Sequence, residues 1–290
     1  MTAQILDGRA LAKKMREELN AEVAAFKEET GVVPTIAVVR VGEDPASVSY
    51  ARAIEKSFTA RGMGFVLRTL PETAQQEEIV TLVASLNADP AIHGIMIQEP
   101  LPKGIDEAAV IEALSPDKDV DGVHPVNAGR LMHNTPPFFT PATPAGGMEI
   151  LRRYQIPIKG KRATIVGRSN IVGRPMALLL MHQHATITVC HSRTVDLAAR
   201  CREGDILVAA VGKPRIIQGD WIKPGAVVID FGVNFVEGKM VGDVDFEKAV
   251  EVAGYITPVP GGTGPMTNVM LARNTLEAAK RQLAKGVGKT

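Results

Sequence analysis

Apolar and polar positions along the first 115 residues alternate between helical and strand-like spacing. Between Asp7 and Glu29 the apolar residues recur every three or four positions, which predicts an amphipathic helix. Beyond Gly31, β-branched runs predict strands at 35–41, 64–69 and 92–97. Helical spacing after these runs predicts helices at 47–61, 74–87 and 105–114. The alternation of strands and helices is typical of a parallel sheet in the α/β class.

The alternation stops between Ser115 and Thr143, where Pro, Gly, Asn and Asp are dense, and this stretch is predicted to be a linker or a loop that lines a cleft. It resumes with a helix at 145–154 and strands at 163–166, 186–190, 206–209 and 226–230. A long helix after Gly264 extends through Leu283, and we expect it to pack on the first half of the chain. The pattern therefore predicts two α/β domains, over residues 1–140 and 141–264, with the helix at 265–284 completing the first.

Composition narrows the class of protein. The chain has 290 residues, of which 45% are hydrophobic and 22% charged, as in an ordinary globular protein. Its net charge of +1 gives no electrostatic sign of nucleic acid or a membrane as partner. Two cysteines are too few for a disulfide framework, and the first residues do not resemble a signal peptide, so we expect a cytoplasmic protein. We expect no metal site, because no carboxylate or cysteine is spaced to complete one with His182 and His184.

A strand, a turn and a helix follow one another in the middle of the chain. The strand ends at Gly167, a short polar turn follows, and Gly173 and Pro175 open a helix. Such a unit brings backbone N–H groups against a phosphate. The spacing differs from the common G-x-G-x-x-G pattern, so the alternative is an ordinary turn of an α/β protein.

About 20 residues beyond that turn, a dinucleotide-binding domain selects between NAD and NADP. This chain has His191, Ser192 and Arg193 there, with no acid to bind free ribose hydroxyls. A hydroxyl and an arginine suit a 2′-phosphate instead, as does Arg168 in the turn. These residues predict NADP as the cofactor.

Four further stretches carry side chains that suggest a binding site. They are 47–50 with Lys56, 98–102, 118–122 with 124–127, and 258–265. Ligands of open α/β sheets collect at the carboxyl ends of the strands, where three of these stretches are predicted to lie. Each also has a structural interpretation: Tyr50 as a half-buried helix residue, Gln98 as a partner of loop backbone, and Asp119 and Asp121 as turn formers.

Taken together, these motifs resemble the methylenetetrahydrofolate dehydrogenase/methenyltetrahydrofolate cyclohydrolase family. The resemblance covers nearly the whole chain and rests on motifs in the same order: 118–122, 127–131, 167–173, 190–194, 242–244 and 258–267. It implies a folate-binding catalytic domain at 1–140, a Rossmann-like NADP-binding domain at 141–264, and a homodimer formed through the latter. Tetrahydrofolate derivatives of one-carbon metabolism are the implied substrates.

The resemblance also implies roles for individual residues. Tyr50 matches the tyrosine that stacks on the folate, Gln98 the glutamine beside the reacting carbon, and Asp121 the aspartate that holds the pterin. Arg168 and Ser192, with Arg193 beside them, match the 2′-phosphate site. The remaining implied contacts are Gly167, Ser169 and Val233 with the cofactor, and Pro260, Gly261, Gly262, Thr263 and Gly264 with the substrate.

The chain departs from the family at one implied catalytic position. The family pattern Tyr-x-x-x-Lys-x-Lys reads here with Tyr50, Ile54 and Lys56, so the first lysine is absent. On a helix, position 54 shares the face of Tyr50, whereas Lys56 is about 200° away. Isoleucine has no titratable proton and cannot transfer protons to or from water. We therefore predict an NADP-dependent dehydrogenase whose cyclohydrolase activity is weak or lost.

Glu99 is a second departure, because the family usually has leucine after the glutamine. Its carboxylate makes the pocket more negative and is a candidate replacement base, or else it faces solvent without a role. Ala142 and Thr263 also differ from the family pattern. Three alternatives stay open: a fully bifunctional enzyme, a catalytically silent homologue that binds pterin or NADP, and a relative acting on a modified pterin.

Overall fold

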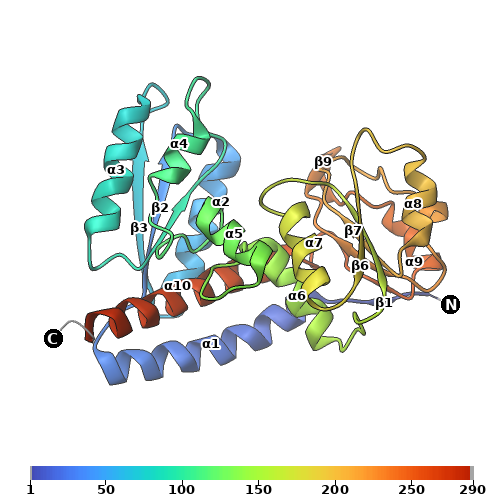
Figure 1. Cartoon of the computed structure of the whole chain (residues 1–290), viewed down its shortest axis with the longest axis horizontal. Helices are drawn as coiled ribbons and strands as arrows, with labels where there is room; N and C mark the ends of the chain where they lie inside the picture. The colour runs from blue at the N-terminus through green and yellow to red at the C-terminus, as the bar shows by residue number, and fades with distance from the viewer. Residues whose placement is uncertain (1, 288–290) are drawn as a thin grey trace. The chain divides into compact units, whose positions relative to one another are not determined.

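The computed structural model describes residues 2–287, which form two compact units. One unit, here called the three-strand unit, comprises Met15–Ala142 and the chain from Asn268 on. The other, the six-strand unit, comprises the chain up to Lys14 and Thr143–Thr267. Each takes its name from its main sheet (Figure 1). Two helices, α1 (Gly8–Thr30) and α10 (Gly264–Val287), contribute residues to both units.

The three-strand unit is built on a parallel sheet in the order β3-β2-β4. Its strands are β2 (Thr35–Val41), β3 (Gly64–Leu70) and β4 (Gly94–Ile97). The central strand β2 is apolar on both faces because both are covered, as parallel strands require. Its helices are α2 (Pro45–Thr59), α3 (Gln76–Ala88), α4 (Glu107–Glu112) and α5 (Pro125–His133).

Helix α10 closes the core of this unit beside β4. A Cβ on Gly94 would overlap Val120 and approach Thr275, so glycine lets the helix and the loop come close to the strand. The Asn274 side-chain amide donates to the carbonyl oxygens of Val120 and Thr140, at 2.8 and 3.1 Å. The middle of α10 is therefore fixed to the two loops that flank α5.

Helix α5 corrects the prediction that Ser115–Thr143 contains no packed element. Its residues Asn127 and Leu131 are buried. The Nδ1 atom of His124 accepts the N–H of Val126, which caps the first turn, and Pro125 follows at a position where proline is tolerated. The density of loop-forming residues concealed a short helix, since Pro and Asn mark helix ends as well as turns.

The six-strand unit has a parallel sheet in the order β1-β11-β8-β7-β5-β6. Its strands are β1 (Gln4–Ile5), β5 (Arg162–Val166), β6 (Thr186–Cys190), β7 (Ile206–Ala209), β8 (Val227–Asp230) and β11 (Tyr255–Ile256). A separate hairpin joins β9 (Asn234–Val236) to β10 (Lys239–Val241). The helices are α6 (Ala142–Arg153), α7 (Gly173–His182), α8 (Leu197–Glu203) and α9 (Phe246–Val252), with a 3-10 turn at Gly219–Trp221.

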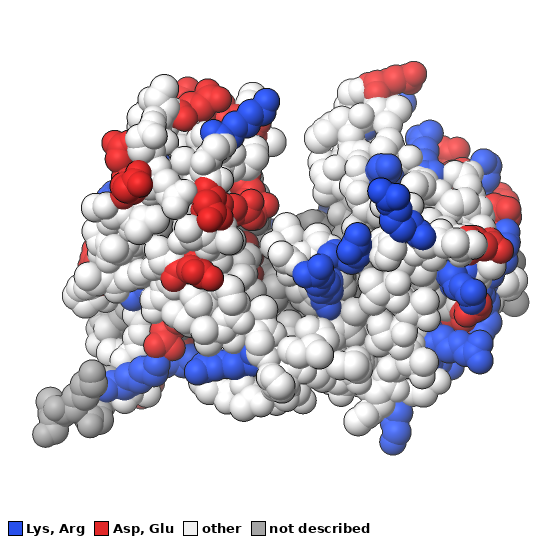
Figure 2. Space-filling model, turned by 45° about the horizontal axis from the view of Figure 1, so that its top comes forward, with Lys and Arg blue, Asp and Glu red and all other residues white. Residues whose placement is uncertain are grey.

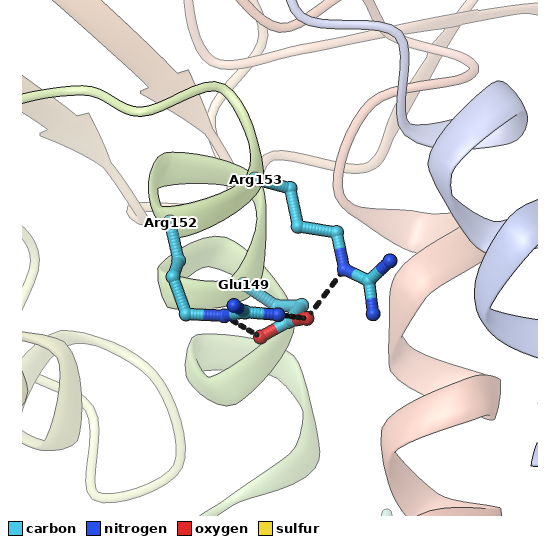
Figure 3. A network of polar contacts seen from close by, with 3 residues as sticks. All are labelled: Glu149, Arg152 and Arg153. Atoms are coloured by element: carbon cyan, nitrogen blue, oxygen red, sulfur yellow. Dashed lines mark hydrogen bonds and ion pairs between the residues drawn. The ribbon is translucent and has the colours of Figure 1, made fainter. Parts of the chain in front are cut away.

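A buried acid lies near the end of α6 (Figure 3). Glu149 accepts from Nε and Nη2 of Arg152, at 2.9 and 2.6 Å, and from Nε of Arg153, at 2.6 Å. Burial raises the pKa of this carboxyl, but the hydrogen bonds from the two arginines outweigh it and hold the pKa below its usual value. The acid is therefore ionised and paired, as a buried charge must be.

Candidate functional site

The amide of Gln98 lies at the carboxyl end of β4, facing the first turn of α2. Gln98 is 3% exposed, and its Nε2 donates to the carbonyl oxygen of Ser47 at 3.0 Å. The hydroxyl of Ser47 donates back to the carbonyl oxygen of Glu99 at 3.1 Å. These two bonds fix the strand end against the helix. The Oε1 atom of Gln98 is buried and has no hydrogen-bond partner, so it is available to accept from a ligand.

Helix α2 buries one face and exposes the other, as the spacing of its apolar residues predicts. Ile54 is 0% exposed and lies on the inward face with Ala51 and Phe58. Tyr50, one turn before Ile54, is half-buried, whereas Lys56 is exposed. The exposure of Lys56 agrees with the prediction that it points away from the tyrosine. The position that carries lysine in the family pattern is therefore an apolar, fully packed one in this chain.

The two aspartates of the Lys-Asp-Val-Asp-Gly motif have different surroundings. Asp119 is fully buried and accepts the N–H groups of Val123 and His124, at 3.0 and 2.9 Å, and the amide of Asn127 at 2.8 Å. It therefore holds the loop together, as the turn-former interpretation predicts. Asp121 is half-buried and accepts the N–H of Ala142.

Three acids act on one another around Asp121. Burial, then the charges of Asp119 and Glu99, raise the pKa of Asp121 to about 7, against the opposing effect of the Ala142 N–H. Burial and the charge of Asp121 raise the pKa of the Tyr50 phenol. Asp121 therefore lies within electrostatic range of both Tyr50 and Glu99.

Glu99 remains accessible to solvent and has an acidic partner. Its carboxyl is hydrogen-bonded to that of Glu107, in the first turn of α4. Burial, and then the charge and hydrogen bond of Glu107, raise the pKa of Glu99. Glu107 is therefore the acidic neighbour that acts on Glu99 most directly.

In the six-strand unit, β5 runs into a turn whose glycines have no room for a side chain. Gly167 has φ of +127°, and a Cβ there would collide with the carbonyl oxygen of Ala210. A Cβ on Gly173 would collide with the carbonyl oxygen of Gly167. The hydroxyl of Ser169 accepts the N–H groups of Val172 and Gly173, at 3.2 and 3.3 Å, and so caps α7. The turn is as tight as close approach of a phosphate requires.

The loop after β6 carries the other residues predicted to bind the 2′-phosphate, and it lies beside the turn after β5. Val166 pairs with Cys190, so Arg168 and Ser192 each lie two residues beyond paired positions of neighbouring strands. Arg168, Ser192 and Arg193 are exposed, and the loop that carries the latter two is closed by the N–H of His191, which donates to Thr194 Oγ1 at 2.9 Å. Two guanidinium groups and a hydroxyl at one edge of a sheet fit a phosphate monoester.

Two buried aspartates shape the loops beyond β7 and β8. Asp243 accepts the N–H groups of Val211, Gly212 and Lys213, at 2.6, 2.9 and 2.9 Å. Asp230 accepts the N–H of Gly232 at 2.8 Å, and so fixes the loop that carries the exposed Val233. Neither acid was predicted from the sequence to have a role. The sequence feature that could have identified them is an aspartate at the end of an apolar strand for Asp230, and an aspartate between Gly and Val for Asp243.

The glycine-rich loop at 258–264 is also tied to β8. Thr263 is buried, and its hydroxyl donates to the carbonyl oxygen of Asp230 at 3.0 Å. Gly261, with φ of +116°, gives its carbonyl oxygen to the N–H of Arg9 at 3.0 Å, and Gly262 donates to Pro258 at 2.8 Å. Pro260 and Gly264 are exposed at the two ends of this bend. The loop is therefore held by its own unit in one defined shape.

Both halves of the chain match the models of one protein family. The model of the tetrahydrofolate dehydrogenase/cyclohydrolase catalytic domain matches residues 6–121, and the model of its NAD(P)-binding domain matches residues 141–283. This chain belongs to the tetrahydrofolate dehydrogenase/cyclohydrolase family. Its α/β fold of two domains and its NAD(P)-binding domain follow from that membership.

Individual members of the family match over almost their whole length. The bifunctional protein FolD of Roseiflexus sp. strain RS-1 is 57% identical over 285 residues, which is 98% of this chain and 99% of the relative. The structure of FolD from Campylobacter jejuni superposes with a TM-score of 0.94 at 42% identity, covering 96% of this chain and 99% of that one. The Trypanosoma brucei enzyme, complexed with NADP cofactor and inhibitor, gives 0.93 at 40% identity, covering 98% and 99%.

The predicted site residues fall into two groups. The three-strand unit brings together Tyr50, Gln98, Glu99 and Asp121, and the six-strand unit carries the residues predicted for the cofactor, with the 258–264 loop. On the face drawn in Figure 2, Lys and Arg predominate on the six-strand unit and Asp and Glu on the three-strand unit. Within residues 2–287 we find neither a metal-binding group of three His, Cys, Asp or Glu nor a helix able to cross a membrane.

Proposed function

We propose that this member of the family is an NADP-dependent 5,10-methylenetetrahydrofolate dehydrogenase whose methenyltetrahydrofolate cyclohydrolase activity is weak or absent. The observation that carries the proposal is Ile54, fully buried one helical turn from Tyr50. The two reactions differ in what they ask of the protein at that position. Only hydrolysis of the methenyl group needs proton transfer to and from water, to which a positioned acid or base contributes about 10²–10⁴-fold.

For the substrate, we assign the folate to the residues collected around Asp121 in the proposed substrate domain, 1–140 with 265–284. The Tyr50 ring stacks on the folate, and the Asp121 carboxylate accepts from the pterin ring N–H and amino groups. The unpartnered Oε1 of Gln98 supplies an acceptor beside the reacting carbon. The loop from Pro260 through Gly261, Gly262 and Thr263 to Gly264 is assigned to the substrate as well.

For the cofactor, we assign NADP to the proposed domain at 141–264. Gly167, Ser169 and Val233 line it, and Arg168, Ser192 and Arg193 bind its 2′-phosphate. When bound, NADP accepts a hydride from the methylene carbon of the folate. The protein then has to hold the two rings face to face, and it has no proton to move.

A fully bifunctional enzyme is the second candidate, favoured by the relatives. Proteins 52–57% identical to this chain over nearly their whole length are named bifunctional protein FolD. In that case another group supplies the proton transfers that the lysine provides elsewhere.

One time course separates the candidates. The protein is mixed with methylenetetrahydrofolate and NADP, and reduced nicotinamide and methenyl product are followed together; the decay of added methenyl substrate is then compared with its decay in buffer. Reduced cofactor and methenyl product that rise in step, with decay no faster than in buffer, support the proposal. Methenyl product that disappears as it forms supports the bifunctional enzyme. Bound ligands with neither signal indicate a silent homologue.

We also propose that the chain forms a homodimer through the six-strand unit. Support comes from the β9–β10 hairpin, where Phe235 is 69% exposed and pairs with the partly exposed Met240. Exposed apolar side chains at neighbouring positions are typical of an interaction surface. A sizing column measures the mass, and Phe235→Glu should convert a dimer to a monomer without unfolding it; a wild-type chain that elutes as a monomer contradicts the proposal.

A further inference from the structure

The acidic residues around the candidate folate site suggest a selectivity that the family membership does not supply. Asp119, Asp121 and the pair of Glu99 and Glu107 belong to one unit, and the charges of Asp119 and Glu99 both act on Asp121. The position one turn from Tyr50 holds the uncharged Ile54. The chain has therefore gained a carboxyl and lost an ammonium relative to the family pattern.

Hydrogen bonds to Ser47 place Glu99 at this strand end. Its carbonyl oxygen is held by the hydroxyl of Ser47, and the preceding residue, Gln98, donates to the backbone of the same serine. Gln98 is nine-tenths buried and presents an unpartnered Oε1 at the same strand end. The hydrogen bond to Glu107 ties the Glu99 side chain to the first turn of α4.

The folates of the proposed reaction differ in charge. Transfer of a hydride from the methylene carbon to the nicotinamide would break one C–H bond of a folate whose one-carbon region is uncharged. It leaves a methenyl group whose positive charge is shared by the two flanking nitrogens, while the nicotinamide loses its own charge. A negative side chain near the folate therefore stabilises the product more than the substrate.

We propose that Glu99 is a specificity-determining residue that makes the site select the folate with a cationic methenyl group over folates whose one-carbon region is uncharged. The inference rests on the proposed function and extends it, because it names the folate that the site prefers. The negative charge of Glu99 adds to that of Asp121, and no ammonium at position 54 cancels either. The acids act through their charge, so direct contact with the one-carbon unit is not required.

The test is the ratio of two dissociation constants, for methenyltetrahydrofolate and for tetrahydrofolate, which lacks the cationic methenyl group, measured on the full chain by ligand fluorescence. Glu99→Gln keeps the shape and removes the charge. We expect it to weaken methenyl binding by about tenfold and to change tetrahydrofolate binding less than about twofold, as loss of one nearby charge predicts. Glu112→Gln removes an exposed acid of the same helix α4 and is the matched control, expected to change neither constant.

The outcomes separate this inference from the function on which it rests. If Glu99→Gln weakens both folates equally, Glu99 serves shape or folding; if it weakens neither, the side chain faces solvent without a role. Either result overturns the inference. A wild-type protein that forms no reduced nicotinamide overturns the proposed function, whereas the ratio of binding constants can still be measured. Glu107→Gln provides a second check, because it leaves Glu99 charged and should preserve the selectivity.

Discussion

Replacing Ile54 by lysine tests the central reasoning directly. The substitution restores the titratable group of the family pattern at a position that is 0% exposed in this chain. A general acid or base contributes about 10²–10⁴-fold, which corresponds to about 3–5 kcal/mol of barrier. We therefore expect Ile54→Lys to accelerate decay of methenyltetrahydrofolate by at least about 100-fold over the wild type, with a smaller effect on dehydrogenation.

The same burial sets a cost for the variant. Loss of the buried isoleucine side chain removes about 1.5–3 kcal/mol of hydrophobic stabilisation. The lysine ammonium also needs polar surroundings. Its methylene chain can reach them by extending along the helix toward Tyr50 and Asp121. We expect the free energy of unfolding to fall by about 2–4 kcal/mol. Denaturant unfolding of each variant shows whether the protein is folded under the conditions of the assay.

The matched control is Ile54→Met, which nearly conserves volume and introduces no titratable group. Decay of the methenyl substrate is followed for wild type, lysine and methionine variants at equal concentrations of folded protein. If the folded lysine variant binds folate and hydrolyses no faster than the methionine variant, an ammonium at position 54 is insufficient for hydrolysis and the reasoning is refuted.

Three further predictions follow from the geometry of the two sites. The pKa of Asp121 is raised to about 7, and we propose that its ionised form accepts from the pterin. Tetrahydrofolate affinity should therefore increase about tenfold per pH unit below pH 7 and level off above it. Asp121→Asn should abolish that pH dependence in a binding titration. Arg168→Ala should weaken NADP about 10–100-fold and leave NAD within about twofold, measured as dissociation constants; equal losses would exclude a 2′-phosphate contact. Asp243→Asn places a side-chain amide donor against the backbone N–H groups that the carboxylate accepts. It should therefore lower the free energy of unfolding by about 1–3 kcal/mol and weaken NADP binding. The exposed control Glu247→Gln should change neither quantity.

Strongly periodic segments were predictable from the sequence. The strands at 35–41, 186–190 and 206–209 have the predicted bounds, because β-branched runs between turn residues have few alternatives. The short strands β1 and β11 were not predicted, since two residues carry no periodicity and pair only through the tertiary fold. The hairpin β9–β10 was missed for a similar reason.

The candidate site was predictable where side-chain chemistry appears in the sequence. The contrast between Ile54 and Lys56 followed from helical spacing alone, and the exposure of Lys56 agrees with it. The contrast between Asp119 and Asp121 could not be predicted from helical spacing. Which carboxylate is buried depends on the donors Val123, His124 and Asn127, which the turn and α5 place around Asp119. The bond between Gln98 and Ser47 joins residues 51 positions apart, which no local pattern reports.

The packed isoleucine at position 54 also matters for small-molecule recognition. If the folate binds as proposed, an analogue whose acceptor atom relies on an ammonium at this position finds no donor here, and burying that acceptor without a donor costs binding energy. An analogue with an amidinium near the one-carbon position would instead gain from the acidic surroundings of Asp121 and from the amide oxygen of Gln98. Compounds of the two kinds should therefore differ in their affinity for this chain and for members of the family that keep the lysine. The charge of an inhibitor then determines its selectivity.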